Sequence, residues 1–155
     1  MADAPAPLSA DVLRGRPGID ILRDMMRGAL PAPPINQLMA TRLVEVGVGL
    51  AVFEGEPGLE HYNPIGSVHG GYAATLLDSC MGCAVHSALP AGSGYTTIDI
   101  NITYVRPMTT ATGTVTARGE VINAGRRVAS ARGTLTDAAG KILAHGTSSL
   151  LIFPL

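Results

Sequence analysis

The sequence predicts an α+β domain in which one curved antiparallel sheet wraps around a long central helix, with a short helix near the N-terminus. The central helix is predicted by residues 70–89, GGYAATLLDSCMGCAVHSAL, which are apolar or small almost all round. A helix without a polar face is normally buried. One alternating segment before this stretch and four strand-like runs after it predict the sheet. The apolar face of a curved sheet can surround such a helix, which makes this packing the most economical one.

Residues 1–18 are rich in alanine and proline and end in RGRPG, which predicts a flexible N-terminal arm. Residues 19–30 then place apolar side chains at helical spacing between charged ones, which predicts a short amphipathic helix. The proline-rich run 31–34 is expected to end that helix. A chain of 155 residues suits one domain, so we expect residues 19–155 to form it.

The strands are predicted from alternation and from the turns between them. Residues 41–54 alternate between two sides, as expected for one half-buried strand. Turn-forming proline and glycine residues separate the later runs, and these short connections predict antiparallel pairing in a meander. The four later strands are expected at Tyr95–Arg106, Thr112–Asn123, Arg126–Asp137 and Lys141–Ile152.

The composition limits the classes of partner. Charged residues make up 15% of the chain, against roughly 25% in a typical soluble domain, which indicates a buried subunit interface. The net charge of −1 provides no basic surface for nucleic acid or for an anionic membrane. No signal peptide is evident, and a charge interrupts the apolar stretch, so we expect a cytoplasmic protein. A small molecule or a second copy of the chain is the expected partner.

Cys80 and Cys83 form a C-M-G-C motif inside the apolar stretch. Redox motifs of this spacing belong at a helix start, and zinc would need further ligands at suitable spacing. We therefore expect two ordinary buried cysteines, with no metal site and no cofactor.

Asp78 is the single formal charge of the apolar stretch and the main indication of function. A buried, unpaired carboxylate is so unfavourable that the group must be paired, protonated or used. In its ionised form it could deprotonate a water molecule or attack a carbonyl carbon itself. The alternative is a structural acid that caps a helix or pairs with an arginine such as Arg106.

Gly70 and Gly71 begin the same stretch. Glycines let the backbone approach a ligand closely, and the first N–H groups of a helix have no intrahelical partners. Together with the helix dipole, these groups predict an oxyanion site for a carbonyl oxygen that becomes negative during reaction. Alternatively, the glycines only allow close packing of the helix on the sheet.

The spacing of Gly70 and Asp78 indicates a site shared between two chains. The two residues are eight positions apart, about 12 Å along a helix axis, which is too far for both to act on one carbonyl. If both act in one site, they come from different copies of the chain. A stripe of mostly small residues on the helix would let two antiparallel helices approach each other. Two equivalent sites per dimer follow from two-fold symmetry.

Asn63 and His69 lie in the loop that leads into the helix. The amide of Asn63 could orient a reacting water or hold the carbonyl, although an Asn-Pro pair is also a common turn. His69 is a candidate for binding substrate or fixing the loop.

At this point the sequence resembles a known family. The run HYNPIGSVHGGYAATLLD, residues 61–78, is similar to the signature of hotdog-fold acyl-CoA thioesterases of the phenylacetate-pathway (PaaI-type) group. The resemblance extends over residues 28–152 and includes TTIDINITYVRP after the central helix. It implies hydrolysis of an acyl-CoA thioester in a homodimer, or in a dimer of dimers, with the sites at the subunit interface.

The resemblance also implies roles for individual residues. Asp78 is the expected base or nucleophile, Gly70 the backbone donor, and Asn63 the residue opposite the acid. His69 is expected to border the site. In some family members a Ser or Thr on the strand after the helix places water beside the acid, and Thr97 matches that position, with Thr96 adjacent to it.

Substrate contacts are predicted less directly. Arg106, Arg126 and Arg127 are candidates for the phosphates of coenzyme A, and solvated surface arginines are the alternative. Tyr72 is a candidate for the acyl pocket, although an apolar position on a central helix is more often part of the core. Gly71, beside the backbone donor, completes the predicted substrate contacts.

The expected function is an acyl-CoA thioesterase that acts on aryl or medium-chain acyl groups, in which coenzyme A is part of the substrate. The alternative is a hotdog protein that binds an acyl thioester without hydrolysing it, and such a binder has no need of a charge at Asp78. An acyl-CoA hydratase on the same fold would carry a different acid–base pattern around the helix, which this sequence does not resemble.

Overall fold

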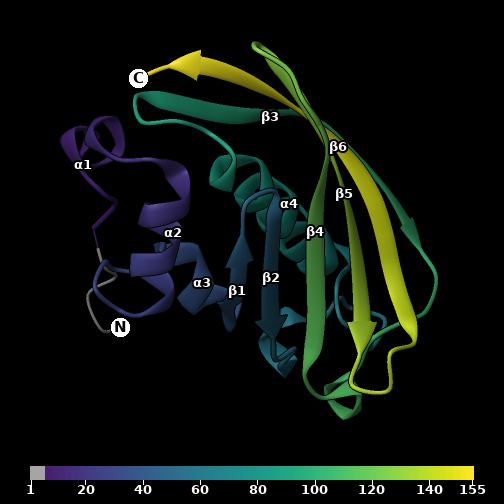
Figure 1. Ribbon diagram of the computed structural model, residues 1–155. Coiled ribbons are helices and arrows are strands. Elements are labelled where there is room, and N and C mark those ends of the chain that lie inside the picture. The colour runs from purple at the N-terminus through teal and green to yellow at the C-terminus, as the bar shows by residue number, and fades with distance from the viewer. Residues whose placement is uncertain (1–5) are drawn as a thin grey trace.

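The computed structural model describes residues 6–155 and contains one six-stranded antiparallel sheet that curves around helix α4 (Figure 1). This architecture confirms the predicted fold class. The helices are α1 (Ala10–Gly15), α2 (Gly18–Met26), α3 (Pro34–Leu38) and α4 (Gly70–Ser87), with short 3-10 turns at Leu59–His61 and Thr110–Thr112. The strands are β1 (Thr41–Gly47), β2 (Leu50–Gly55), β3 (Ser93–Tyr104), β4 (Val115–Ala124), β5 (Val128–Asp137) and β6 (Ile142–Pro154).

The strand order is β1-β2-β4-β5-β6-β3, with every neighbouring pair antiparallel. The meander prediction is correct for β4, β5 and β6 but wrong for β3, which pairs with β6 along its whole length. Residues 105–114 therefore do not form a tight reversal. Instead, this ten-residue connection crosses the ends of β6 and β5 to reach β4. As a result β3 is an edge strand, with one side of its backbone unpaired among residues 6–155.

The segment 41–54, predicted as one strand, is a hairpin of β1 and β2. The pairing of Gly47 with Leu50 leaves Val48 and Gly49 as a two-residue turn. Gly49 has φ +77°, the left-handed conformation that such a turn requires and that glycine adopts without strain. Because the turn contains two residues, the alternation continues through it, and this concealed the reversal in the sequence.

Part of the predicted N-terminal arm is helical. Residues 10–18, assigned to that arm, form α1 and the first residue of α2, whose Gly18 N–H donates to the carbonyl of Leu89. Residues 1–5 of the predicted arm lie outside the described residues. Helix α2 ends at Met26, earlier than predicted, because Gly28 (φ +76°) turns the chain and the N–H of Ala29 returns to the carbonyl of Asp24. The proline run then leads into α3, which the sequence did not predict.

Helix α4 packs one face on the concave side of the sheet. The contact is close because β4 carries Gly119 beneath the helix: a Cβ there would lie 2.2 Å from the carbonyl oxygen of Cys80. The described residues leave the opposite face of α4 uncovered, so Gly71 and Thr75 are partly exposed and Asp78 is exposed. The expectation of a fully buried Asp78 is therefore wrong for the single chain, because the sheet covers only one side of the helix.

His86 lies in the last turn of α4, with its ring tilted against Tyr95 at a centroid distance of 5.4 Å. Burial lowers the pKa of His86 from its ordinary value of 6.5. The unfolded chain therefore binds a proton near pH 6 that the folded chain does not, and folding stability falls as the pH drops below 6.5. We expect the urea midpoint to decrease between pH 7.5 and pH 5.5.

The decrease should be smaller in a His86→Gln variant, whose side chain does not titrate. The matched control is His145→Gln, since His145 is exposed on β6, and this variant should keep the wild-type decrease. An equal decrease in the wild type and in His86→Gln would contradict the assignment of the effect to His86.

Candidate active site

The loop that precedes α4 is held at both ends. Val68 donates its N–H to the carbonyl of Met108, and His69 donates to the carbonyl of His61, at 2.9 and 2.8 Å. Within the loop, Asn63 and Ser67 are joined by a backbone hydrogen bond of 2.8 Å. The start of α4 is thereby tied to the other end of the loop and to the distant segment around Met108.

Asn63 organises this loop. Its Oδ1 accepts from the N–H groups of Ile65 and Ser67 at 3.1 and 3.3 Å, and its Nδ2 donates to the Ser67 hydroxyl at 3.0 Å. These contacts match the alternative expectation for Asn63, in which the Asn-Pro pair forms a turn. An amide nitrogen carries two donor hydrogens, and only one of them has an acceptor among the described residues. The structure therefore places Asn63 before the helix start with one donor free.

The two glycine donors at the start of α4 differ in availability. His69 is the N-cap, and its Nδ1 accepts from the N–H of Gly71 at 2.8 Å. The N–H of Gly70, the first helical residue, has no acceptor among the residues that the structure describes. Gly70 rather than Gly71 thus presents the open donor, at the positive end of the longest helix of residues 6–155.

Asp78 is joined to Thr97 on the neighbouring edge strand. The Thr97 hydroxyl donates to Asp78 Oδ1 at 2.8 Å. The pairing register of β3 shifts at Ile98, and a bulge of this kind re-aims neighbouring side chains. Thr96 is exposed, and its side chain lies on the other face of the strand. Of the two threonines, only Thr97 contacts the acid.

Asp78 forms no salt bridge within residues 6–155. The proposed partner Arg106 instead donates from Nη1 to the carbonyl of Ile142 at 2.6 Å. Pairing of Asp78 with Arg106 is thus not found, and the carboxylate is open to solvent apart from the contact with Thr97.

Helix α4 is continuous from Gly70 to Ser87. The eight positions between Gly70 and Asp78 therefore correspond to about 12 Å along its axis. Within one chain, the free backbone donor and the free carboxylate cannot both contact one carbonyl group.

The three candidate arginines lie at opposite ends of the sheet. The N–H of Arg106 donates to the carbonyl of Leu143, whereas the carbonyl of Arg127 accepts from the N–H of Ile152. Leu143 and Ile152 are nine residues apart on β6, which corresponds to about 30 Å. Arg126 and Arg127 line an open hollow of about 510 Å³ with Ser93 and residues 151–154. One chain thus does not gather these arginines into a single phosphate site.

A second hollow, of about 420 Å³, lies beside the start of α4. Three of the predicted site residues line it: His69, Gly71 and Tyr72. Sequence reasoning missed Met39 and Tyr62, because they come from separate segments that only the fold brings together. Its complete lining is Met39, Glu60, His61, Tyr62, His69, Gly71, Tyr72 and Thr75. We call this space the helix-start hollow.

Tyr72 forms the inner boundary of the helix-start hollow. It is 2% exposed, its ring is tilted against His61 at a centroid distance of 4.7 Å, and its buried hydroxyl has no hydrogen-bond partner among the described residues. Burial, with smaller contributions from Glu56 and Glu60, raises the pKa of Tyr72 far above its usual value. Tyr72 therefore stays neutral and is chiefly a core residue.

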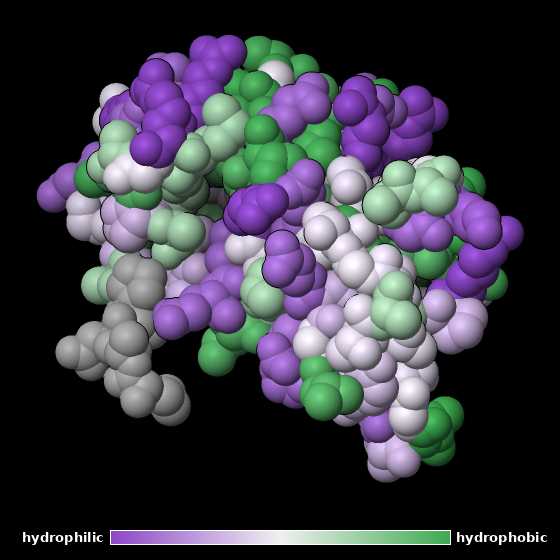
Figure 2. All heavy atoms as spheres, turned by 90° about the horizontal axis from the view of Figure 1, so that it is seen from below, coloured by the Kyte–Doolittle hydropathy of each residue, from purple (hydrophilic) through white to green (hydrophobic). Residues whose placement is uncertain are grey.

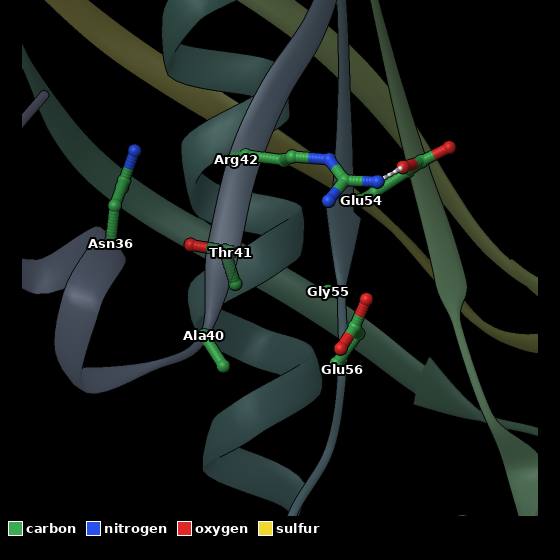
Figure 3. Close-up of a pocket in the computed structure, with 7 residues that line it drawn as sticks. All are labelled: Asn36, Ala40, Thr41, Arg42, Glu54, Gly55 and Glu56. Atoms are coloured by element: carbon green, nitrogen blue, oxygen red, sulfur yellow. Dashed lines mark hydrogen bonds and ion pairs between the residues drawn. The ribbon is translucent and has the colours of Figure 1, made fainter.

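Gly55 makes room for Tyr72, because a Cβ on Gly55 would lie 2.5 Å from the Tyr72 hydroxyl. On the outer side of Gly55 is a polar hollow of about 190 Å³ (Figure 3). There Arg42 of β1 and Glu54 of β2 form an ion pair. None of the predicted site residues lines this hollow, and the pairing already compensates the charge of Arg42.

Figure 2 shows the molecule from below. On this face a group of apolar residues lies between two hydrophilic areas near the top of the view, and residues of intermediate hydropathy predominate toward the lower right. Within residues 6–155, no helix combines the length and the apolar character needed to cross a membrane.

Comparisons with known proteins identify the family of the chain. The thioesterase superfamily model matches residues 65–144. Human acyl-coenzyme A thioesterase 13 is 30% identical over 127 residues, which are 81% of this chain and 89% of that protein. A protein of Halobacterium salinarum described as an esterase is 46% identical over 65 residues, 41% of each chain.

Solved structures of thioesterases have the same fold as this chain. A variant of the phenylacetic acid degradation protein PaaI from Thermus thermophilus superimposes with a TM-score of 0.69 and 27% identity, over 76% of this chain and 97% of that one. A thioesterase family protein from Silicibacter pomeroyi reaches a TM-score of 0.77 at 20% identity, over 86% and 99% of the two chains, and supports the fold alone. The chain therefore belongs to the thioesterase superfamily and is a thioester hydrolase of the hotdog fold.

Proposed function

We propose that the protein hydrolyses the thioester of an aryl or medium-chain acyl-CoA to the free acid and coenzyme A. The observation that carries the proposal is the pair of open groups on α4: the Asp78 carboxylate, oriented by Thr97, and the N–H of Gly70, which has no acceptor among the described residues. The similarity to acyl-coenzyme A thioesterase 13 supports the choice of an acyl-CoA as substrate.

In the proposed reaction, the N–H of Gly70 donates to the thioester carbonyl oxygen, which becomes negative in the transition state. Asp78 removes a proton from a water molecule as the oxygen of that water bonds to the carbonyl carbon. The C–S bond then breaks, and the sulfur leaves with the electron pair and receives a proton. Direct attack by Asp78, followed by hydrolysis of the acyl-enzyme, is the other route. Both routes use water and groups of the chain, without a further cofactor.

Residues around these two groups are proposed to bind and orient the substrate. The helix-start hollow lies beside Gly70 and is the proposed place for the acyl group, bordered by His69, Gly71 and Tyr72. The free amide N–H of Asn63 is proposed to hold the water or the carbonyl oxygen. Thr97 is proposed to keep one carboxylate oxygen of Asp78 fixed, so that the other faces the water.

The site is proposed to form between two chains of a homodimer, alone or within a dimer of dimers. The 12 Å between Gly70 and Asp78 requires a second chain if both act on one carbonyl. The uncovered face of α4 and the unpaired edge of β3 supply a surface for it, and Ile98 and Ile100 on β3 are 57% and 37% exposed. A long exposed edge strand favours pairing with another strand. In such an assembly, arginines of both chains can flank one site, which makes Arg106, Arg126 and Arg127 candidates for the phosphates.

The test is thiol release from a panel of acyl-CoA esters with short, medium, long and aryl acyl groups. We expect turnover, with the highest kcat/KM for aryl or medium-chain substrates. Binding of these esters without release of coenzyme A would support a non-catalytic acyl-CoA-binding protein instead. Absence of turnover across the panel would contradict the proposed function.

A further inference from the structure

Tyr104 connects the end of the edge strand β3 to the start of α4. Its hydroxyl donates to the carbonyl oxygen of Gly70 at 3.0 Å, across 34 residues of sequence. Its ring also lies against the same glycine, since a Cβ on Gly70 would be 3.2 Å from three ring and hydroxyl atoms of Tyr104. The side chain is 54% exposed, so it contributes little to the core. Its direct contacts are with the residue that carries the open backbone donor.

The peptide group between Gly70 and Gly71 is held at both of its polar ends. Its carbonyl oxygen accepts from Tyr104, and its N–H donates to His69 Nδ1 at 2.8 Å. The neighbouring peptide carries the open N–H of Gly70. Two consecutive glycines rotate more freely than other residues, so an unanchored helix start would let this N–H point in several directions. Contacts on both ends of the following peptide restrict that rotation.

We propose that Tyr104 is a positioning residue for the oxyanion donor: it fixes the Gly70–Gly71 peptide so that the Gly70 N–H points at the substrate carbonyl. This inference rests on the proposed function. Tyr104 itself touches no reacting atom and acts through Gly70. Preorganised donors stabilise the transition state most when they need no reorientation during the reaction. The proposal also explains why position 70 carries glycine, because a side chain there would press on the Tyr104 ring.

A Tyr104→Phe variant keeps the ring and removes the hydroxyl. We expect kcat to fall about five- to tenfold, the range of one ordinary hydrogen bond, while KM changes by less than about twofold. The matched control is Thr136→Val, which removes a hydroxyl that donates to the carbonyl of Thr116 within the sheet, away from α4. The control should retain the wild-type kcat. An unchanged kcat in Tyr104→Phe would overturn the proposal.

A double-mutant cycle with Gly70→Ala separates positioning from general destabilisation. The added Cβ keeps the Gly70 N–H but displaces the Tyr104 ring, and so weakens the same hydrogen bond. We expect the double variant to have the kcat of Gly70→Ala within about twofold, because the hydroxyl has no further effect once displaced. Strict multiplication of the two single effects would overturn the proposal.

Amide hydrogen exchange tests the contact without reference to turnover. In Tyr104→Phe we expect faster exchange at Gly71, whose N–H depends on the orientation of the same peptide, and unchanged exchange at residues in the middle of α4. Equal exchange at Gly71 in both proteins would overturn the positioning role. If exchange at Gly71 is faster in Tyr104→Phe than in the wild type, but the wild type hydrolyses no acyl-CoA, only the proposed function is overturned.

Discussion

Replacement of Asp78 by asparagine is expected to lower kcat about 10²–10⁴-fold, the usual contribution of a general base. The amide has nearly the shape of the carboxylate, and its oxygen can still accept the hydrogen bond from Thr97. It has no basic oxygen to receive a proton from water, and it is a poor nucleophile. The fold and the oligomeric state should therefore be retained while the chemistry is lost. Steady-state thiol release measures kcat and KM, and gel filtration with a thermal scan checks the fold.

The charge-matched control is Glu45→Gln, because Glu45 is an exposed acid on β1 that contacts none of the candidate groups. This variant should keep wild-type kcat. If Asp78→Asn retains more than about a tenth of the wild-type kcat, Asp78 contributes less than a general base does. Such a result would contradict both proposed routes, since each needs the ionised carboxylate.

Local patterns were sufficient to predict α2, α4 and the later strands, but not α1, α3, the division of β1 from β2 or all of the strand pairings. The apolar run after Gly70 predicted α4 to within two residues of its end, because a helix and its capping loop are determined by neighbours in sequence. Pairing of β3 with β6 rather than with β4 joins segments about fifty residues apart, and alternation within a strand does not encode its partner. The β1–β2 turn was missed for the related reason that a two-residue turn preserves the alternation.

The site, too, was predictable where it depends on local sequence and not where it depends on contacts between distant segments. His69, Gly70 and Asp78 could be proposed as site residues from the sequence because they lie at the start of, or within, one helix. The burial expected for Asp78 was wrong, since helix composition does not say which of its faces the chain itself covers. Tyr104 could not be identified from the sequence, because its contact with Gly70 depends on where β3 ends relative to α4.

Removal of the backbone donor is the second change with a large expected effect. Gly70→Pro deletes the N–H that has no acceptor among the described residues, and proline is well tolerated at the first position of a helix. The preceding residue, His69, already has the extended backbone that proline requires before it, with φ −60° and ψ 138°. We expect kcat to fall about 10²–10³-fold, the typical effect of losing one oxyanion donor. Gly70→Ala is the matched comparison, because it adds a Cβ that also displaces the Tyr104 ring but keeps the N–H, and its kcat should therefore fall far less than that of Gly70→Pro.

Mixing the two inactive variants tests whether the site is shared. In a dimer that combines one Asp78→Asn chain with one Gly70→Pro chain, the intact Gly70 of the first faces the intact Asp78 of the second, so one of its two sites is complete. Random pairing makes half of the dimers mixed, so we expect about one quarter of wild-type activity in the unfractionated mixture and about one half in purified mixed dimers. Chains carrying different affinity tags, refolded together and purified through both tags, establish that exchange took place. Mixed dimers that show only the residual activity of the two variants would mean that no site combines Gly70 of one chain with Asp78 of the other, and would contradict the shared site.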